Sequence, residues 1–162
     1  MKAPHLILGI GELLWDVLPE GPLLGGAPAN FTVMAGRLGD HAVILSRIGR
    51  DELGRNAVNI LDPLPVDSGH LQVDPVHETG RVTVTLKDGQ PEYIIHQPAA
   101  WDFLELSDEW LQMAERADAF RQFGSGDGTD FRKLPVKFEE SIVSMVPLLS
   151  ESRAPRNNGS PA

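Results

Sequence analysis

The sequence predicts an α/β fold in which buried strands alternate with helices and a small antiparallel hairpin interrupts the pattern. Residues 5–11 and 42–48 are apolar runs typical of strands buried on both faces, and a helical pattern follows each of them. Residues 81–86 instead alternate apolar and polar side chains, which predicts a half-buried antiparallel strand. The chain has 162 residues, enough for one domain with a real core but not for two full domains.

The composition argues against several classes of partner. The formal net charge is -9, from 14 Lys plus Arg against 23 Asp plus Glu, without a long basic run. Binding to nucleic acid or to an anionic membrane depends on clustered cations, so we expect neither. The chain has no cysteine and its five histidines lack metal-ligand spacing, so we expect no disulfide and no metal site. The apolar run over residues 6–10 is too short for a signal peptide core or a membrane span, which favours a cytoplasmic chain.

The first predicted strand, residues 5–11, is followed directly by two acids, Glu12 and Asp16. In open α/β sheets, functional side chains commonly lie just beyond the carboxyl ends of the strands. A stretch rich in proline and glycine, residues 19–22, then predicts a turn. We therefore expect the two acids to lie at a functional edge of the sheet.

Residues 25–30 predict a tight loop that leads into the N-terminus of a helix. Gly25 and Gly26 have no Cβ, so backbone can approach a ligand there, and Pro28 presets the first helical turn. A helix start offers unpaired N–H groups, and Asn30 adds a side chain that both donates and accepts hydrogen bonds. These hydrogen-bonding groups suit a polyhydroxylated or anionic small molecule. The alternative is a turn that only begins a core helix.

Two strand–helix units follow from this loop. The helix is expected to end at Gly39 and to face the core with a stripe of residues three and four apart: Phe31, Met34, Ala35 and Leu38. Residues 42–48 then form a strand, and this order is typical of a right-handed parallel crossover. Asp51 can cap the next helix, and Pro63 ends it.

The middle of the chain departs from this pattern. Residues 70–73 predict a short strand, and residues 81–86 and 92–97 predict a hairpin with Asp88 and Gly89 in its turn. We expect this hairpin to leave the main sheet and cover a site. Ser107 starts a further helix, residues 117–123 predict a strand, residues 136–146 a helix, and residues 150–162 a disordered tail.

Three segments in order, residues 25–30, 36–39 and 46–54, resemble the first signature region of the ribokinase/PfkB family of carbohydrate kinases, closest to its fructokinase-like members. Supporting segments agree: residues 9–12 with Asp16 resemble the opening strand and sugar-contacting acid of that family, and residues 79–80 and 97–102 resemble the start of its lid and the return from it. The likeness covers about residues 5–119. Each motif is modest alone, but their order and spacing are hard to reach by chance.

The resemblance implies a ribokinase-like three-layer α/β/α sheet with a small antiparallel β lid, formed by about residues 12–24 and 80–98. It also implies transfer of the ATP γ-phosphate to a monosaccharide hydroxyl, assisted by Mg2+. Asp16 would accept hydrogen bonds from sugar hydroxyls, Gly25 and Gly26 would let backbone approach the sugar, and Asn30 would bind another hydroxyl. Lids in this family can build dimers, so the resemblance also allows a homodimer through the lid.

The likeness is lost from about residue 120, so we divide the chain into residues 1–119, a non-family segment 120–149 and a tail 150–162. We expect the nucleotide and catalytic region of the family to be absent. Residues 124–127 are similar to its Gly-Ala-Gly-Asp-type turn, which makes Asp127 a candidate catalytic base. The other alignment, which we favour because Arg121 and Gln122 replace the expected Asp-Thr pair, leaves Asp127 without a catalytic role.

Three functional hypotheses follow from the sequence. The first is a sugar kinase that acts on a fructose-like monosaccharide and is incomplete in this chain. The second is a sugar-binding fragment without catalysis, because the implied sugar contacts all precede residue 31. The third is an inactive truncated product, or an interaction protein that pairs through the lid.

Overall fold

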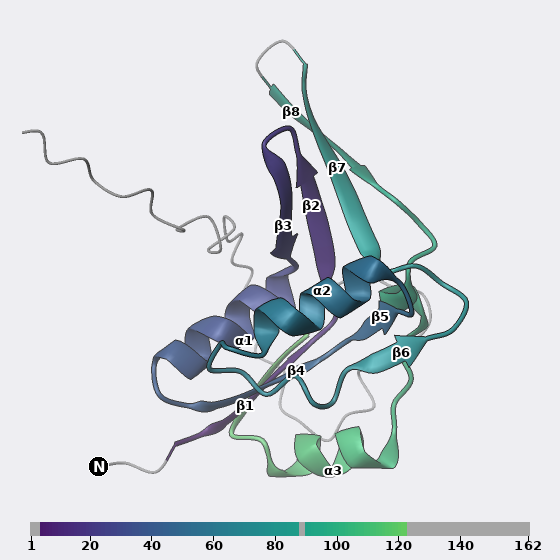
Figure 1. Ribbon diagram of the computed structural model, residues 1–162. Coiled ribbons are helices and arrows are strands. Elements are labelled where there is room, and N and C mark those ends of the chain that lie inside the picture. The colour runs from purple at the N-terminus through teal and green to yellow at the C-terminus, as the bar shows by residue number, and fades with distance from the viewer. Residues whose placement is uncertain (1–3, 88–89, 123–162) are drawn as a thin grey trace, which may run out of the picture.

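A computed structural model of the chain describes residues 4–87 and 90–122. Its elements run in the order β1 (Leu6–Ile10), β2 (Leu14–Leu18), β3 (Gly21–Gly25), α1 (Ala27–Arg37), β4 (His41–Leu45), β5 (Arg47–Gly49), α2 (Glu52–Leu61), β6 (Gln72–Asp74), β7 (Gly80–Lys87), β8 (Gln90–Ile95), the 3-10 turn η1 (Ala100–Phe103), α3 (Asp108–Arg116) and β9 (Ala119–Gln122). Three layers and a projecting lid are visible in Figure 1.

The middle layer is a parallel sheet with the strand order β4-β1-β9. Helices α1 and α2 cover one face of this sheet and α3 covers the other (Figure 1). Leu8 and Ile10 of β1 are fully buried and pack with Trp110 of α3 on the α3 side. The predicted α/β fold with buried parallel strands is thereby confirmed.

Helix α1 approaches β1 very closely because Gly9 has no side chain. A Cβ at Gly9 would lie 2.8 Å from the Pro28 carbonyl oxygen and 3.0 Å from Thr32 Cγ2. Pro28 and Thr32, which make this contact, are buried together with Ala29, Asn30, Val33 and Ala35. The predicted core stripe was wrong at Leu38, which lies just beyond the end of α1 and has an exposed fraction of 80%.

Residues 42–48, predicted as one strand, form two strands that belong to different sheets. Strand β4 ends at Leu45, and β5 begins at Arg47 and pairs with β6 in a separate two-stranded sheet. Ser46 lies at the break, fully buried, and its Oγ donates a hydrogen bond to the Gly11 carbonyl (2.6 Å). The break is held by this bond between distant residues, so the strand propensity of residues 42–48 alone could not predict it.

The lid is a four-stranded sheet with the order β3-β2-β7-β8 that stands away from the central sheet (Figure 1). Strand β2 pairs antiparallel with β3 and parallel with β7, and β7 and β8 form the predicted antiparallel hairpin. The turn predicted over residues 19–22 was wrong in part, because Gly21 and Pro22 belong to β3 and the turn is confined to residues 19–20. The predicted turn residues Asp88 and Gly89 lie outside the described residues.

Helix α3 and strand β9 complete the described part of the chain. Ser107 caps α3 as predicted, accepting a hydrogen bond from the Trp110 N–H (3.2 Å). Strand β9 pairs in parallel with β1 and crosses position 119, where we expected the family likeness to end; the domain division stays a prediction. The predicted helix and tail, and Asp127, lie outside the described residues. No helix within residues 4–87 and 90–122 is long and apolar enough to cross a membrane.

Candidate functional site

The residues expected to contact a ligand gather where β1 ends, the lid begins and α1 starts. Asp16 lies on β2, Gly25 ends β3, and Gly26 precedes the first residue of α1. A Cβ at Gly25 would lie 2.7 Å from Asp16 Oδ2, and the Asn30 N–H donates to the Gly26 carbonyl (3.0 Å). The structure therefore brings Asp16 and the first turn of α1, which carries Asn30, to the same glycine turn.

Both glycines of this turn are required by contacts within the chain. Gly26 has a φ of +107°, a backbone conformation that other residues rarely adopt, and a Cβ there would collide with the Glu12 carbonyl oxygen. Beside Gly25, the space that a side chain would need is occupied by the Asp16 carboxylate. Their predicted role, to let backbone approach a sugar, stays a prediction.

Asn30 lies in the first turn of α1 with an exposed fraction of 7%. Its side-chain carboxamide has no hydrogen-bond partner within the part of the chain that the structure describes. Neither of its polar atoms is among the buried side-chain atoms of the described residues that lack a partner, so the carboxamide is within reach of solvent. The group is therefore available to a ligand that offers both a donor and an acceptor.

Asp16 supplies the acidic group of the site. Its side chain is half-buried, and burial raises the pKa of Asp16 above its ordinary value. The carboxylate lies beside Gly25 at the root of the lid. A carboxylate in this position can accept hydrogen bonds from hydroxyl groups, and further burial by a closing lid would strengthen those bonds.

Glu12 is a further acid of the site, to which the sequence alone gave no separate role. Its Oε1 accepts the Ala27 N–H (3.2 Å), and its Oε2 is buried without a hydrogen-bond partner among the described residues. Burial raises the pKa of Glu12, against hydrogen bonds from its own N–H and that of Ala27. The signal in the sequence was its position directly after the first strand.

The root of the lid is fixed by Asp51, the N-cap residue of α2. Asp51 Oδ2 accepts the Thr79 N–H, Asp51 Oδ1 accepts the Thr79 hydroxyl (both 2.7 Å), and that hydroxyl accepts the Gly49 N–H (2.9 Å). Burial opposes ionisation of Asp51, but these bonds and the Gly54 N–H outweigh it and lower its pKa. Thr79 directly precedes β7, so α2 anchors the lid.

A second cluster of charges lies next to this root. Arg47 Nε lies 2.9 Å from Asp74 Oδ2 in an ion pair that is almost fully buried. Although burial acts to raise it, the pKa of Asp74 is lowered to about 2, chiefly by hydrogen bonds from the His77 and Val76 backbone N–H groups. His77 also stacks on Phe103 with ring centroids 3.6 Å apart. These contacts join β5, β6 and the η1 turn.

The glycine turn does not fit a triphosphate. The first N–H of α1 is already used by Glu12, and the acids Glu12 and Asp16 disfavour a second anion there. Within residues 4–87 and 90–122, no three His, Asp or Glu side chains are placed to hold a metal ion. The described site thus suits a neutral, hydroxyl-rich molecule.

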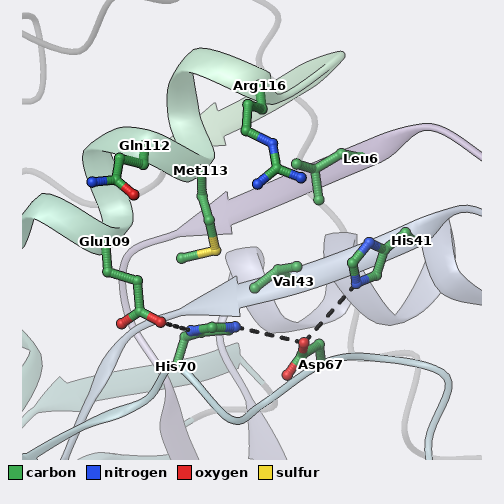
Figure 2. Close-up of a pocket in the computed structure, with 9 residues that line it drawn as sticks. All are labelled: Leu6, His41, Val43, Asp67, His70, Glu109, Gln112, Met113 and Arg116. Carbon is green, nitrogen blue, oxygen red and sulfur yellow. Dashed lines mark ion pairs between the residues drawn. The ribbon is translucent and has the colours of Figure 1, made fainter.

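Figure 2 shows a separate pocket of about 400 Å3 between α3, β4 and the segment that carries Asp67 and His70. His70 lies between two acids, with Nδ1 3.0 Å from Glu109 Oε1 and Nε2 3.6 Å from Asp67 Oδ2. Leu6, Val43 and Met113 supply the apolar part of its lining. The residues lining this pocket include none of the predicted site residues, so it is distinct from the glycine turn.

The chain is similar in sequence to known proteins. The family model for pfkB family carbohydrate kinases matches residues 23–125 of the chain. Fructokinase-1 of Zea mays is 34% identical over 135 residues, which cover 75% of this chain and 42% of that protein.

Two solved structures resemble the described fold. A sugar kinase of Pyrococcus horikoshii in complex with ATP superposes with a TM-score of 0.64 at 30% identity, over 72% of this chain and 42% of that one. A Vibrio cholerae fructokinase bound to fructose, ADP and calcium superposes with a TM-score of 0.55 at 30% identity, over 69% of this chain and 37% of that one. The chain spans about two fifths of the length of these relatives.

Proposed function

The chain belongs to the pfkB family of carbohydrate kinases, and from this membership we propose that it supplies the sugar-binding and lid part of a kinase. The reaction is transfer of the ATP γ-phosphate to a hydroxyl group of a fructose-like monosaccharide. One observation carries the proposal: the Asp16 carboxylate and the first turn of α1, which carries Asn30, lie at one glycine turn at the root of a lid. A neutral sugar offers hydroxyl groups to both.

Each described residue has a role in this proposal. Asp16 accepts hydrogen bonds from sugar hydroxyls, and Asn30 binds a further hydroxyl. Gly25 and Gly26 keep the turn free of side chains, so that backbone lines the sugar. The lid strands β2, β3, β7 and β8 cover the bound sugar and exclude water, which protects the transferred phosphoryl group from hydrolysis.

The phosphoryl donor in the proposed reaction is ATP with Mg2+. Support comes from relatives, since the Pyrococcus horikoshii kinase was solved with ATP and the Vibrio cholerae fructokinase with fructose and ADP. We assign nucleotide binding and the catalytic base to residues other than those described; Asp127 is one candidate for that base. A requirement for ATP and the absence of cysteine favour the cytoplasm as the site of action.

Calorimetry separates sugar binding from catalysis. The full chain is titrated with fructose and with ribose, in the presence and absence of ATP and Mg2+, and sugar-dependent release of ADP is measured in parallel. We expect fructose to bind and Asp16→Ala to abolish the binding. Absence of binding by any monosaccharide to folded protein would contradict the proposal.

A second candidate function is a sugar-binding module without catalysis. The observation that favours it is the misfit between the glycine turn and a triphosphate, together with the presence of every proposed sugar contact before residue 31. Sugar binding without any ADP release would support this candidate. ADP release that depends on sugar would exclude it.

A further inference from the structure

Glu12 joins two segments of the site in a way that the proposed function does not use. Its Oε1 accepts the N–H of Ala27, the first residue of α1, at 3.2 Å. Its backbone occupies the space beside Gly26, where a Cβ would collide with the Glu12 carbonyl oxygen. The end of β1 and the turn that leads to Asn30 are therefore in direct contact at this residue.

The residue before Glu12 is held firmly by the central sheet. The Gly11 N–H donates to the Leu45 carbonyl (3.2 Å), and Ser46 Oγ donates to the Gly11 carbonyl (2.6 Å). Leu45 and Ser46 are both fully buried. Because Gly11 is fixed from two sides, a contact made by Glu12 transmits the position of the sheet to the start of α1.

The Glu12 carboxyl group makes this contact with one oxygen only. Oε2 is buried and has no hydrogen-bond partner among the described residues, and none of the ion pairs found there includes Glu12. Burial raises the pKa of Glu12 and so favours the neutral acid. The helix N-terminus acts in the opposite sense, because it stabilises a negative charge nearby.

We propose that Glu12 is a positioning residue for the sugar site, holding the turn of Gly26 and Ala27 against the end of β1 through the hydrogen bond that Oε1 accepts. Glu12 performs this role by accepting that hydrogen bond and not through its negative charge. The inference rests on the proposed function, since it is the sugar contacts of Asp16 and Asn30 that the turn positions.

Three variants of the full chain test this inference: Glu12→Ala, Glu12→Gln and the control Glu20→Ala, which changes an exposed acid in the turn between β2 and β3. Amide hydrogen exchange at Ala27 reports on the hydrogen bond, and calorimetry with fructose reports on the site. We expect Glu12→Ala to lose Ala27 protection and to weaken fructose binding on the order of tenfold, because the part-buried Ala27 N–H is left unpaired. Glu12→Gln keeps an acceptor and restores both to within about twofold of wild type, and Glu20→Ala changes neither.

Two results would overturn the inference: unchanged Ala27 protection in Glu12→Ala, or a loss in Glu12→Gln as large as in Glu12→Ala, which would assign the role to charge. If Glu12→Ala does not fold, Glu12→Gln decides alone, since retained protection and affinity support the inference and their loss overturns it. A third result would separate this inference from the proposed function. If wild type binds no sugar but Ala27 protection still differs among the variants as expected, the proposed function is wrong and only the Glu12–Ala27 hydrogen bond is supported.

Discussion

At the scale of single residues, Asn30 is the most direct test of the sugar site. Its carboxamide has no hydrogen-bond partner among the described residues and is not one of their buried unpaired groups, so a bound sugar hydroxyl can reach it. We expect Asn30→Ala to weaken fructose binding by roughly tenfold, the cost of about one well-placed hydrogen bond, and to leave any nucleotide binding unchanged.

The measurement is calorimetry with fructose and, separately, with ATP. Asn59→Ala, a change on the exposed side of α2, serves as the matched control and should have no effect on either. Equal losses of sugar and nucleotide binding in Asn30→Ala would contradict the assignment of this residue to the sugar.

Asp74 makes the stability of the chain depend on pH. Its pKa is lowered in the folded state from 3.8 to about 2, so the ionised form is favoured by folding. The stabilisation is present above pH 3.8 and is lost as the pH falls through 2. Asp74→Asn should flatten this part of the stability curve and lower the free energy of unfolding at neutral pH by roughly 1–3 kcal/mol.

Chemical unfolding followed between pH 2 and pH 7 measures both effects of Asp74→Asn. Asp62→Asn, in an exposed residue at the end of α2, is the control and should keep the wild-type slope. If Asp74→Asn retained that slope as well, another carboxylate would be responsible for the acid sensitivity.

At the scale of elements, local sequence signals predicted where helices begin. They did not predict features that depend on contacts between residues far apart in the sequence. Asp51 and Ser107 accept hydrogen bonds from residues three positions later, so their caps are visible in the sequence itself. The face of α1 that packs on the sheet instead depends on contacts of Pro28 and Thr32 with Gly9 of β1, and Leu38 lies beyond the end of the helix. The break at Ser46 likewise depends on Gly11, which is 35 residues away.

The candidate site shows the same division. The helix start at Gly25, Gly26 and Asn30 was predicted from the residues themselves, whereas a common site with Asp16, which lies within β2, was implied only by the family resemblance. The contact of Glu12 with Ala27 was not predicted, since it requires the lid strands β2 and β3 to return the chain to the end of β1. The resemblance implied lid strands in this region, but the local pattern around Pro19 and Pro22 indicated only a turn.

The lid root offers a prediction at this scale. Thr79→Val keeps the shape of the side chain but removes the hydroxyl that joins Asp51 to the Gly49 N–H. We expect the free energy of unfolding to fall by roughly 1–3 kcal/mol, because Gly49 is left with a buried unpaired donor. Loss of hydrogen-exchange protection at Gly49 should accompany it.

The control for this change is Thr85→Val on the exposed part of β7, measured by the same unfolding and exchange experiments. It should cost little, since β-branched residues are favoured in strands. Equal stability of wild type and Thr79→Val would show that the lid is not anchored through this hydroxyl.

At the scale of the whole molecule, the chain has the ribokinase-like α/β/α arrangement predicted from its sequence and spans about two fifths of the relatives it matches. Its lid presents an apolar edge strand. Tyr93, Ile94 and Ile95 of β8 have exposed fractions of 63%, 53% and 57%, and β8 is the last strand in the order of the lid sheet. An exposed apolar edge strand tends to pair with another strand.

We therefore expect two copies of the chain to associate through β8, and Ile94→Lys to prevent it by placing a charge on the paired edge. Sedimentation of wild type should give a dimer whose fraction rises with protein concentration, while Ile94→Lys should remain monomeric with an unchanged circular dichroism spectrum. Val76→Lys places the same charge on a side chain that is 78% exposed but lies outside the lid strands, and it should still dimerise. Loss of the dimer in both variants, or in neither, would locate the interface elsewhere than on the lid.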